Sequence, residues 1–220
     1  MKVYNNIGKN DKGTLAQFCQ YLSSESSGLN ENQKVNLAYK WITENIKYDH
    51  EGLEAGTQIT DPDKFFKSRK TVCSGYARLL RRLLESMDYN PDNIKNIIGY
   101  AKGAGYSVYE EPESNHEWNA IKMNGKWCLF DAIWDEGETY YEYFCPNPNC
   151  FVRNHLPENP EEQFLDKPLD LETFHGLAWT TGGFCQFDAT IVEDKSYYNQ
   201  CNGKFTLTIG NDNDKVLTYL

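Results

Sequence analysis

The fold of this chain is decided by the stretch Lys70-Thr71-Val72-Cys73-Ser74-Gly75-Tyr76-Ala77-Arg78-Leu79-Leu80. Apolar side chains recur along it and beyond it at the spacing of one helix face, at Tyr76, Leu79, Leu80, Leu83, Leu84 and Met87. Thr71 or Ser74 is suited to cap the start of that helix, because a hydroxyl oxygen can accept from a first-turn N–H group. We therefore predict an amphipathic helix with Cys73 at or just before its first turn.

Cys73 has two interpretations at this position. The unpaired N–H groups and the positive end of the helix dipole stabilise a thiolate, which favours a reactive nucleophile. The small residues Ser74, Gly75 and Ala77 leave room for a substrate beside the sulfur. Cysteine is also among the most often buried residue types, so an inert cysteine in a core helix is the commoner case. This stretch alone leaves both interpretations open.

Other elements are predicted from the same kinds of signal. Residues 30–33, Asn-Glu-Asn-Gln, resemble a capping box at the start of a helix. Asp61-Pro62 has the form of a cap followed by the first helical residue. The expected elements are helices over residues 14–24, from residue 30 to about 47 and from residue 61, a strand at 94–100 and a hairpin at 204–218.

A β-hairpin is predicted around the dipeptide Asn124-Gly125. Residues 115–123 and 126–134 have the character of strands, and Asn-Gly favours a two-residue type I′ turn because both turn positions need positive φ. Such a turn fixes the pairing of the two strands, with Met123 opposite Lys126.

That register brings two polar side chains to one face of the hairpin. Trp118 is expected opposite Asp131, and His116 opposite Ile133. His116 and Asp131 are then diagonal neighbours with Cα atoms about 7–8 Å apart, a gap that an imidazole–carboxylate hydrogen bond can span. A slip of one residue would put the two side chains on opposite faces, so the prediction depends on the turn.

Cys73, His116 and Asp131 together match the chemistry of nucleophilic acyl transfer. His116 would take the proton of the Cys73 thiol and later protonate the leaving group. Asp131 would hold the imidazole tautomer and stabilise the imidazolium. The oxyanion would be bound by backbone N–H groups near Cys73 and by a side-chain donor that the sequence does not identify.

The segments around these residues resemble the transglutaminase-like superfamily. The resemblance is carried by VCSGYA at residues 72–77, NHEWNAIKMNGKWCLFDAIW at 115–134 and the preceding helix AYKWITENIKYD at 38–49. Further segments at residues 142–144, 151–157 and 163–165 resemble the branch of the kyphoscoliosis peptidase and the cytokinesis protein. In all, the resemblance runs from about Asn30 to about Phe174. One departure is Ala132, which follows Asp131 where members of the family often have proline.

The resemblance implies an α+β fold, the papain-like transglutaminase core, with N-terminal helices and the Cys73 helix packed across an antiparallel sheet. We expect this core over residues 1–172 and a β-rich extension, or the start of a following β-domain, over 173–220. The expected function is a cysteine-dependent hydrolase or transferase acting on peptide or protein amides, either a peptidase or amidase or a transglutaminase. The alternative is a weakly active or inactive protein-interaction module of cytoskeletal or cell-division machinery.

Composition limits the partners of the chain. The 220 residues carry a formal net charge of −10 and no basic run, which makes nucleic acid and anionic membranes poor partners. The sequence contains no apolar run of membrane-spanning length, and its first residues lack the apolar core of a signal peptide. We therefore expect a cytoplasmic protein.

The seven cysteines are odd in number and scattered, which favours a reducing compartment over a disulfide framework. Cys145 and Cys150 could be half of a zinc site, but no matching second pair exists, so we interpret them as loop cysteines. No metal or cofactor is expected. His155 is interpreted as structural, and His50 and His175 have no partner pattern.

Overall fold

A computed structural model describes residues 11–103, 106, 107, 109–139, 141–180, 189–191 and 209–211. The chain forms two compact units. The first combines residues 1–97 with 117–144, and the second combines 98–116 with 145–220. The predicted boundary at residue 172 stays a prediction, since most of the residues beyond it lie outside the described part.

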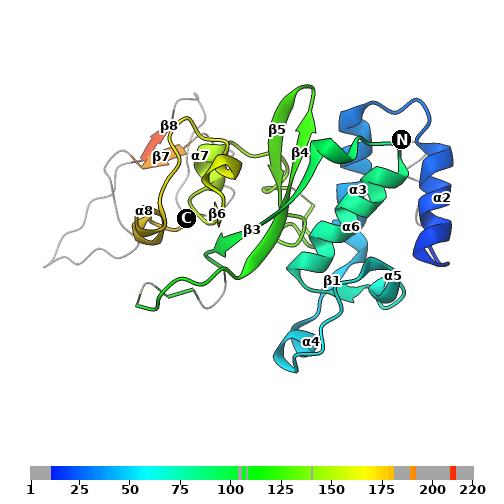
Figure 1. The fold of residues 1–220 in the computed structure, drawn as a ribbon, viewed down its shortest axis with the longest axis horizontal. Helices are drawn as coiled ribbons and strands as arrows, with labels where there is room; N and C mark the ends of the chain where they lie inside the picture. The colour runs from blue at the N-terminus through cyan, green and yellow to red at the C-terminus, as the bar shows by residue number, and fades with distance from the viewer. Residues whose placement is uncertain are drawn as a thin grey trace, which may run out of the picture. The chain divides into compact units, whose positions relative to one another are not determined.

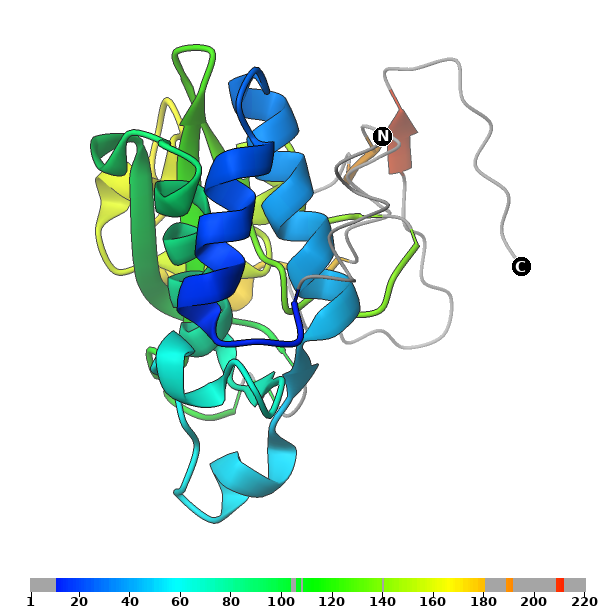
Figure 2. The ribbon, with the colours of Figure 1, turned by 90° about the vertical axis from the view of Figure 1, so that its right-hand side faces the viewer.

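Three helices lie side by side in the first unit (Figures 1 and 2): α2 (Leu15–Glu25), α3 (Glu31–Asn45) and α6 (Cys73–Ser86). Thr14 caps α2 and Asn30 caps α3, each in a complete capping box, so the predicted helix starts are confirmed. Asp61 caps the short helix α5 (Pro62–Phe65), also as predicted. The helices bury a common core that includes Phe18, Leu22, Val35, Trp41, Ile42, Phe66, Leu79, Leu80, Leu83 and Leu84.

The start of α6 differs from the prediction in its cap. Val72 occupies the cap position and makes no side-chain cap bond, so neither Thr71 nor Ser74 acts as the cap. The Thr71 hydroxyl instead donates to the carbonyl of Ile59 at 2.6 Å. A Cβ at Gly75 would lie 1.8 Å from the Thr71 Oγ1 atom, so a side chain at residue 75 would force Thr71 to shift.

The sheet of the first unit contains the predicted hairpin. Strand β4 (His116–Met123) pairs antiparallel with β5 (Lys126–Phe130), with Met123 opposite Lys126, and β3 (Ile94–Ala101) follows β4 in the strand order. Asn124 and Gly125 have φ values of 49° and 82°, as a type I′ turn requires. The turn and its register are therefore confirmed.

Strand β5 is shorter than predicted, because it ends at Phe130 instead of running to residue 134. The amide of Asp131 donates to the carbonyl of Tyr143, and its Oδ1 atom accepts from the amide of Ile133. The ladder between β4 and β5 therefore ends with Asn119 opposite Phe130, and the predicted pairings of Trp118 with Asp131 and of His116 with Ile133 are both wrong.

Two short strands that the sequence did not predict lie beside the start of α6. Strand β1 (Lys47–Tyr48) pairs parallel with β2 (Lys70–Thr71), with Tyr48 opposite Thr71. The helix α4 (His50–Glu54) follows β1, with Asp49 as its cap. A one-turn 3₁₀ helix, η1 (Pro91–Asn93), leads into β3.

In the second unit, the end of β3 pairs antiparallel with β6 (His155–Pro157). The helices of this unit are α7 (Pro148–Phe151), η2 (Pro160–Gln163) and α8 (Leu171–Gly176), and its core contains Val152, Leu156 and Phe174. Strand β7 (Ala189–Ile191) pairs antiparallel with β8 (Ile209–Asn211). Residues 209–211 of the hairpin predicted at 204–218 thus pair with β7 instead, and the rest of that hairpin lies outside the described residues. Helices combined with antiparallel strands make this an α+β fold, as predicted.

Candidate active site

Cys73 is the first residue of α6, which confirms its predicted place at a helix N-terminus. Its side chain is half-buried and carries a free thiol. The first N–H groups of a helix lack partners four residues earlier within the helix. At this helix start the amides of Gly75 and Tyr76 donate to the carbonyl of Val72, at 2.8 and 3.2 Å, which leaves the amides of Cys73 and Ser74 as the first-turn donors. A half-buried thiol beside such donors fits a nucleophile better than an inert core cysteine.

Tyr48 is a neighbour of Cys73 that sequence reasoning missed. The pairing of β1 with β2 places Tyr48 opposite Thr71, two residues before Cys73, and the amide of Asp49 donates to the Thr71 carbonyl at 2.9 Å. Burial raises the pKa of the Tyr48 phenol, and the negative charge of a Cys73 thiolate raises it further. The phenol is therefore a neutral donor close to the sulfur.

The surroundings of Tyr48 leave its hydroxyl available. The side chain is half-buried, and its ring contacts the exposed His50 edge to face, with ring centroids 4.6 Å apart. No described residue forms a hydrogen bond with the hydroxyl. No local signal could have found this residue, because a two-residue strand shows no periodicity.

Asp131 is buried, with 2% of its surface exposed, and it follows β5 directly. One carboxylate oxygen accepts from the amide of Ile133 at 3.1 Å. Its backbone carbonyl accepts from the hydroxyl of Tyr39 at 2.8 Å. The backbone and carboxylate of this residue are thus held on several sides.

A second buried carboxylate lies four residues further on. Asp135 is fully buried and accepts from the Tyr39 hydroxyl at 2.5 Å and from the amides of Glu142 and Tyr143 at 2.8 and 3.0 Å. Burial raises the pKa of Asp135 to about 6, against these hydrogen bonds, which favour its charged form. Tyr39 therefore links Asp135 to the backbone of Asp131.

His116 belongs to the second unit, whereas Cys73 and Asp131 belong to the first. Within the second unit, the half-buried His116 ring lies with its centroid 5.4 Å from that of His155. His155 is fully buried, stacks on Phe151 and has Nδ1 2.7 Å from the Asn154 Oδ1 atom, which agrees with the structural role expected of it. The convergence of the three predicted residues stays a prediction.

The cysteines correct one expectation. Cys128 and Cys145 are disulfide-bonded, whereas Cys19, Cys73 and Cys150 are not in disulfides. The prediction of reduced thiols is therefore wrong for both Cys128 and Cys145. Spacing in the sequence could not show this, because a disulfide depends on distances that only the fold sets.

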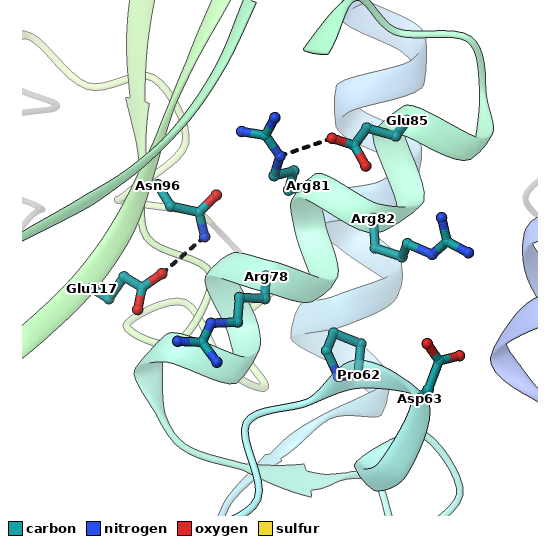
Figure 3. A pocket seen from close by; sticks show the side chains of 8 residues that line it. All are labelled: Pro62, Asp63, Arg78, Arg81, Arg82, Glu85, Asn96 and Glu117. Atoms are coloured by element: carbon teal, nitrogen blue, oxygen red, sulfur yellow. Dashed lines mark hydrogen bonds and ion pairs between the residues drawn. The ribbon is translucent and has the colours of Figure 1, made fainter. Parts of the chain in front are cut away.

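Residues of α5, α6, β3 and β4 line a pocket of about 460 Å³ (Figure 3), and neither Cys73 nor Asp131 is among them. It is lined by Pro62, Asp63, Arg78, Arg81, Arg82, Glu85, Asn96 and Glu117. Three arginines face three acidic residues, and the guanidinium groups are spread around the pocket instead of turning toward one point. Arg81 pairs with Glu85 at 2.8 Å, so part of this charge is already neutralised. The pocket does not concentrate charge of one sign.

A comparison with protein families decides the wider relationship. The sequence profile of the transglutaminase-like superfamily matches residues 17–132, just over half of the chain. The chain belongs to this superfamily. The match spans both Cys73 and Asp131, and the resemblance stated from the motifs is confirmed. No helix among the described residues is long and apolar enough to cross a membrane.

Relatives in the superfamily fit the predicted branch. The chain is 30% identical to the kyphoscoliosis peptidase of Mus musculus over 80% of its own length and 29% of that protein. It is 24% identical to cytokinesis protein 3 of Schizosaccharomyces pombe over 67% of its length and 18% of that protein. A solved structure titled as a TGase matches with a TM-score of 0.38 and 17% identity, over 63% of this chain and 37% of that chain. The chain thus spans less than a third of the length of these curated relatives.

Proposed function

We propose that this protein is a cysteine-dependent acyl-transfer enzyme that acts on peptide or protein amides. The observation that carries the proposal is the half-buried free thiol of Cys73 at the N-terminus of α6. Membership of the transglutaminase-like superfamily supports it. The proposed catalytic residues are Cys73, His116 and Asp131, and no cofactor is needed for this chemistry.

In the proposed mechanism, His116 takes the proton of the Cys73 thiol, and the thiolate attacks the amide carbonyl carbon. The C–N bond then breaks as His116 returns the proton to the leaving amine, which leaves a thioester on Cys73. Water or a second amine attacks the thioester and releases the acyl group and the thiol. The acceptor decides whether the enzyme is a peptidase or a transglutaminase.

We assign Tyr48 as the side-chain donor to the oxyanion, together with first-turn N–H groups of α6. Three observations support this assignment: the place of Tyr48 beside Thr71, a hydroxyl that forms no hydrogen bond with a described residue, and the rise in the pKa of Tyr48 that the charge of Cys73 causes. A neutral phenol can donate a hydrogen bond to a developing oxyanion at the moment when charge forms. Replacing Tyr48 by Phe should then lower kcat more than it changes KM.

The alternative function is protein interaction in cytoskeletal or cell-division machinery. It is favoured by the relative named cytokinesis protein 3. A cytoplasmic location remains a prediction of the composition.

A direct test uses Cys73→Ala, His116→Ala and Asp131→Asn, with Cys150→Ala as a control that removes another cysteine that is not in a disulfide. Ammonia release and amine incorporation are measured on a glutamine-containing peptide, and new amino termini on a general peptide substrate. The first two variants should abolish turnover, Asp131→Asn should lose most of it, and the control should keep it. The enzyme proposal fails if the wild-type protein shows no turnover and forms no covalent adduct at Cys73. If partner capture then survives Cys73→Ala, the protein-interaction function is the one supported.

A further inference from the structure

The loop after β5 carries a carboxylate that bonds to both elements beside Cys73. The Glu136 Oε2 atom accepts from the backbone amide of Tyr48 at 2.9 Å and from the hydroxyl of Tyr76 at 2.7 Å. Its Oε1 atom lies 3.2 Å from the Lys47 Nζ atom. One side chain therefore bonds to strand β1 and to helix α6 at once.

The residues that Glu136 contacts lie next to the proposed catalytic groups. Tyr48 is the proposed oxyanion donor, and Tyr76 lies in the first turn of α6, three residues after Cys73. The Tyr76 ring is 2% exposed, and burial, followed by the hydrogen bond to Glu136, raises the pKa of its phenol. The phenol is thus a permanent donor to the carboxylate.

Glu136 is itself held by its backbone. Its amide donates to the carbonyl of Ile133 at 3.1 Å, and the next residue, Gly137, donates to the carbonyl of Thr43 in α3 at 2.9 Å. Gly137 has a φ of 75°, a conformation that favours glycine. The loop that carries the carboxylate is therefore hydrogen-bonded to α3, which restricts the position of the Glu136 side chain.

We propose that Glu136 is a positioning residue of the active site, which fixes Tyr48 relative to Cys73 by bonding β1 and α6 through one carboxylate oxygen. This proposal rests on the proposed function, because that function gives Tyr48 and Cys73 their catalytic roles. The contacts of the Glu136 side chain with described residues are to the Tyr48 amide, the Tyr76 hydroxyl and Lys47, so it acts through the placement of Tyr48 and Cys73. Misplacing a reacting group by about 1 Å can cost about 100-fold in rate, so a small shift of β1 is enough to matter.

The experiment compares Glu136→Ala with Glu136→Gln. The alanine variant loses both bonds, whereas a glutamine carbonyl oxygen can accept from the Tyr48 amide and the Tyr76 hydroxyl and loses only the exposed ion pair to Lys47. We expect kcat to fall at least about tenfold in Glu136→Ala with KM changed less than about threefold, and Glu136→Gln to stay within about threefold of wild type. Glu138→Ala, in the same loop and exposed, is the matched control.

A second readout does not need turnover. Hydrogen exchange at the Tyr48 amide should accelerate at least about tenfold in Glu136→Ala and stay near wild type in Glu136→Gln, because that amide loses its acceptor only in the first. If the wild type has no turnover, the proposed function fails, yet this exchange pattern still tests whether Glu136 holds β1.

Three results would overturn the proposal. One is a Glu136→Ala variant with wild-type kcat well below its melting temperature, and another is a Glu136→Gln variant as slow as the alanine variant. The third is an unchanged Tyr48 exchange rate in Glu136→Ala. Should the alanine variant not fold, Tyr76→Phe removes one of the two bonds and keeps the ring, and it should lower kcat with a smaller loss of stability.

Discussion

Replacing Asp135 by Asn should remove a pH-dependent loss of stability that the wild-type protein shows between pH 5 and 7.5. Asp135 has no exposed surface, and burial raises its pKa from 3.8 to about 6. Hydrogen bonds from the Tyr39 hydroxyl and from the amides of Glu142 and Tyr143 lower this pKa, and the charge of Asp131 raises it further. The group is thus a buried acid that titrates within an accessible range of pH.

The sign of the effect follows from which state binds the proton more tightly. The folded state does so, because its pKa is higher than that of the unfolded chain. The stabilising contribution of this group is therefore complete below about pH 3.8 and is lost as the pH rises through about 6. The full difference corresponds to about 3 kcal/mol, at about 1.36 kcal/mol for each unit of pKa. About 1.4 kcal/mol of that loss falls between pH 5 and 7.5.

The assay is urea unfolding of wild type and Asp135→Asn at several pH values in this range. The amide cannot accept from the Tyr39 hydroxyl and both backbone amides together, so the variant should be less stable at every pH, by about 1–3 kcal/mol. The informative quantity is the change with pH. Between pH 5 and 7.5, the free energy of unfolding of the variant should fall by about 1.4 kcal/mol less than that of the wild type. Parallel curves for the two proteins would refute the reasoning, and Glu138→Gln provides an exposed control.

Two further predictions test the neighbourhood of Cys73. Brief iodoacetamide treatment followed by mass mapping should label Cys73 before Cys19 and Cys150. Cys128 and Cys145 should be labelled only after reduction, since both are disulfide-bonded. Faster labelling of Cys150 would mean that exposure controls reactivity. Gly75→Ala should destabilise the protein by about 1–3 kcal/mol in urea unfolding, because the new Cβ would meet the Thr71 side chain at 1.8 Å; a variant as stable as wild type would show that β2 can move aside.

The parts of the fold that were predictable from sequence are those set by local chemistry. Asn30 and Gln33 form the capping box that their spacing indicates, because both partners lie within one helical turn. Asn124-Gly125 fixes the register of the hairpin, since few other residues adopt positive φ twice in succession. The place of Cys73 at the start of a helix likewise follows from periodicity that begins just after it.

The errors occur where a distant partner decides the local structure. Residues 131–134 have the apolar character of a strand, yet the amide of Asp131 bonds to the carbonyl of Tyr143, and β5 ends. Thr71 is a residue type that often caps helices, yet its hydroxyl donates a hydrogen bond to the carbonyl of Ile59, twelve residues upstream. Neither partner can be identified from the spacing of residues nearby.

The same distinction explains which residues of the candidate site the sequence could supply. Nucleophile, base and orienting acid are chosen for their chemistry, so Cys73, His116 and Asp131 could be proposed from residue type and from motif. Tyr48 and Glu136 are ordinary residue types, and they gain a role only when β1 lies against β2 and the loop after β5 reaches both β1 and α6. Because positioning depends on the fold and chemistry on the side chain, substitutions at Glu136 should change rates without changing the reaction, whereas substitutions at Cys73 should remove the reaction itself.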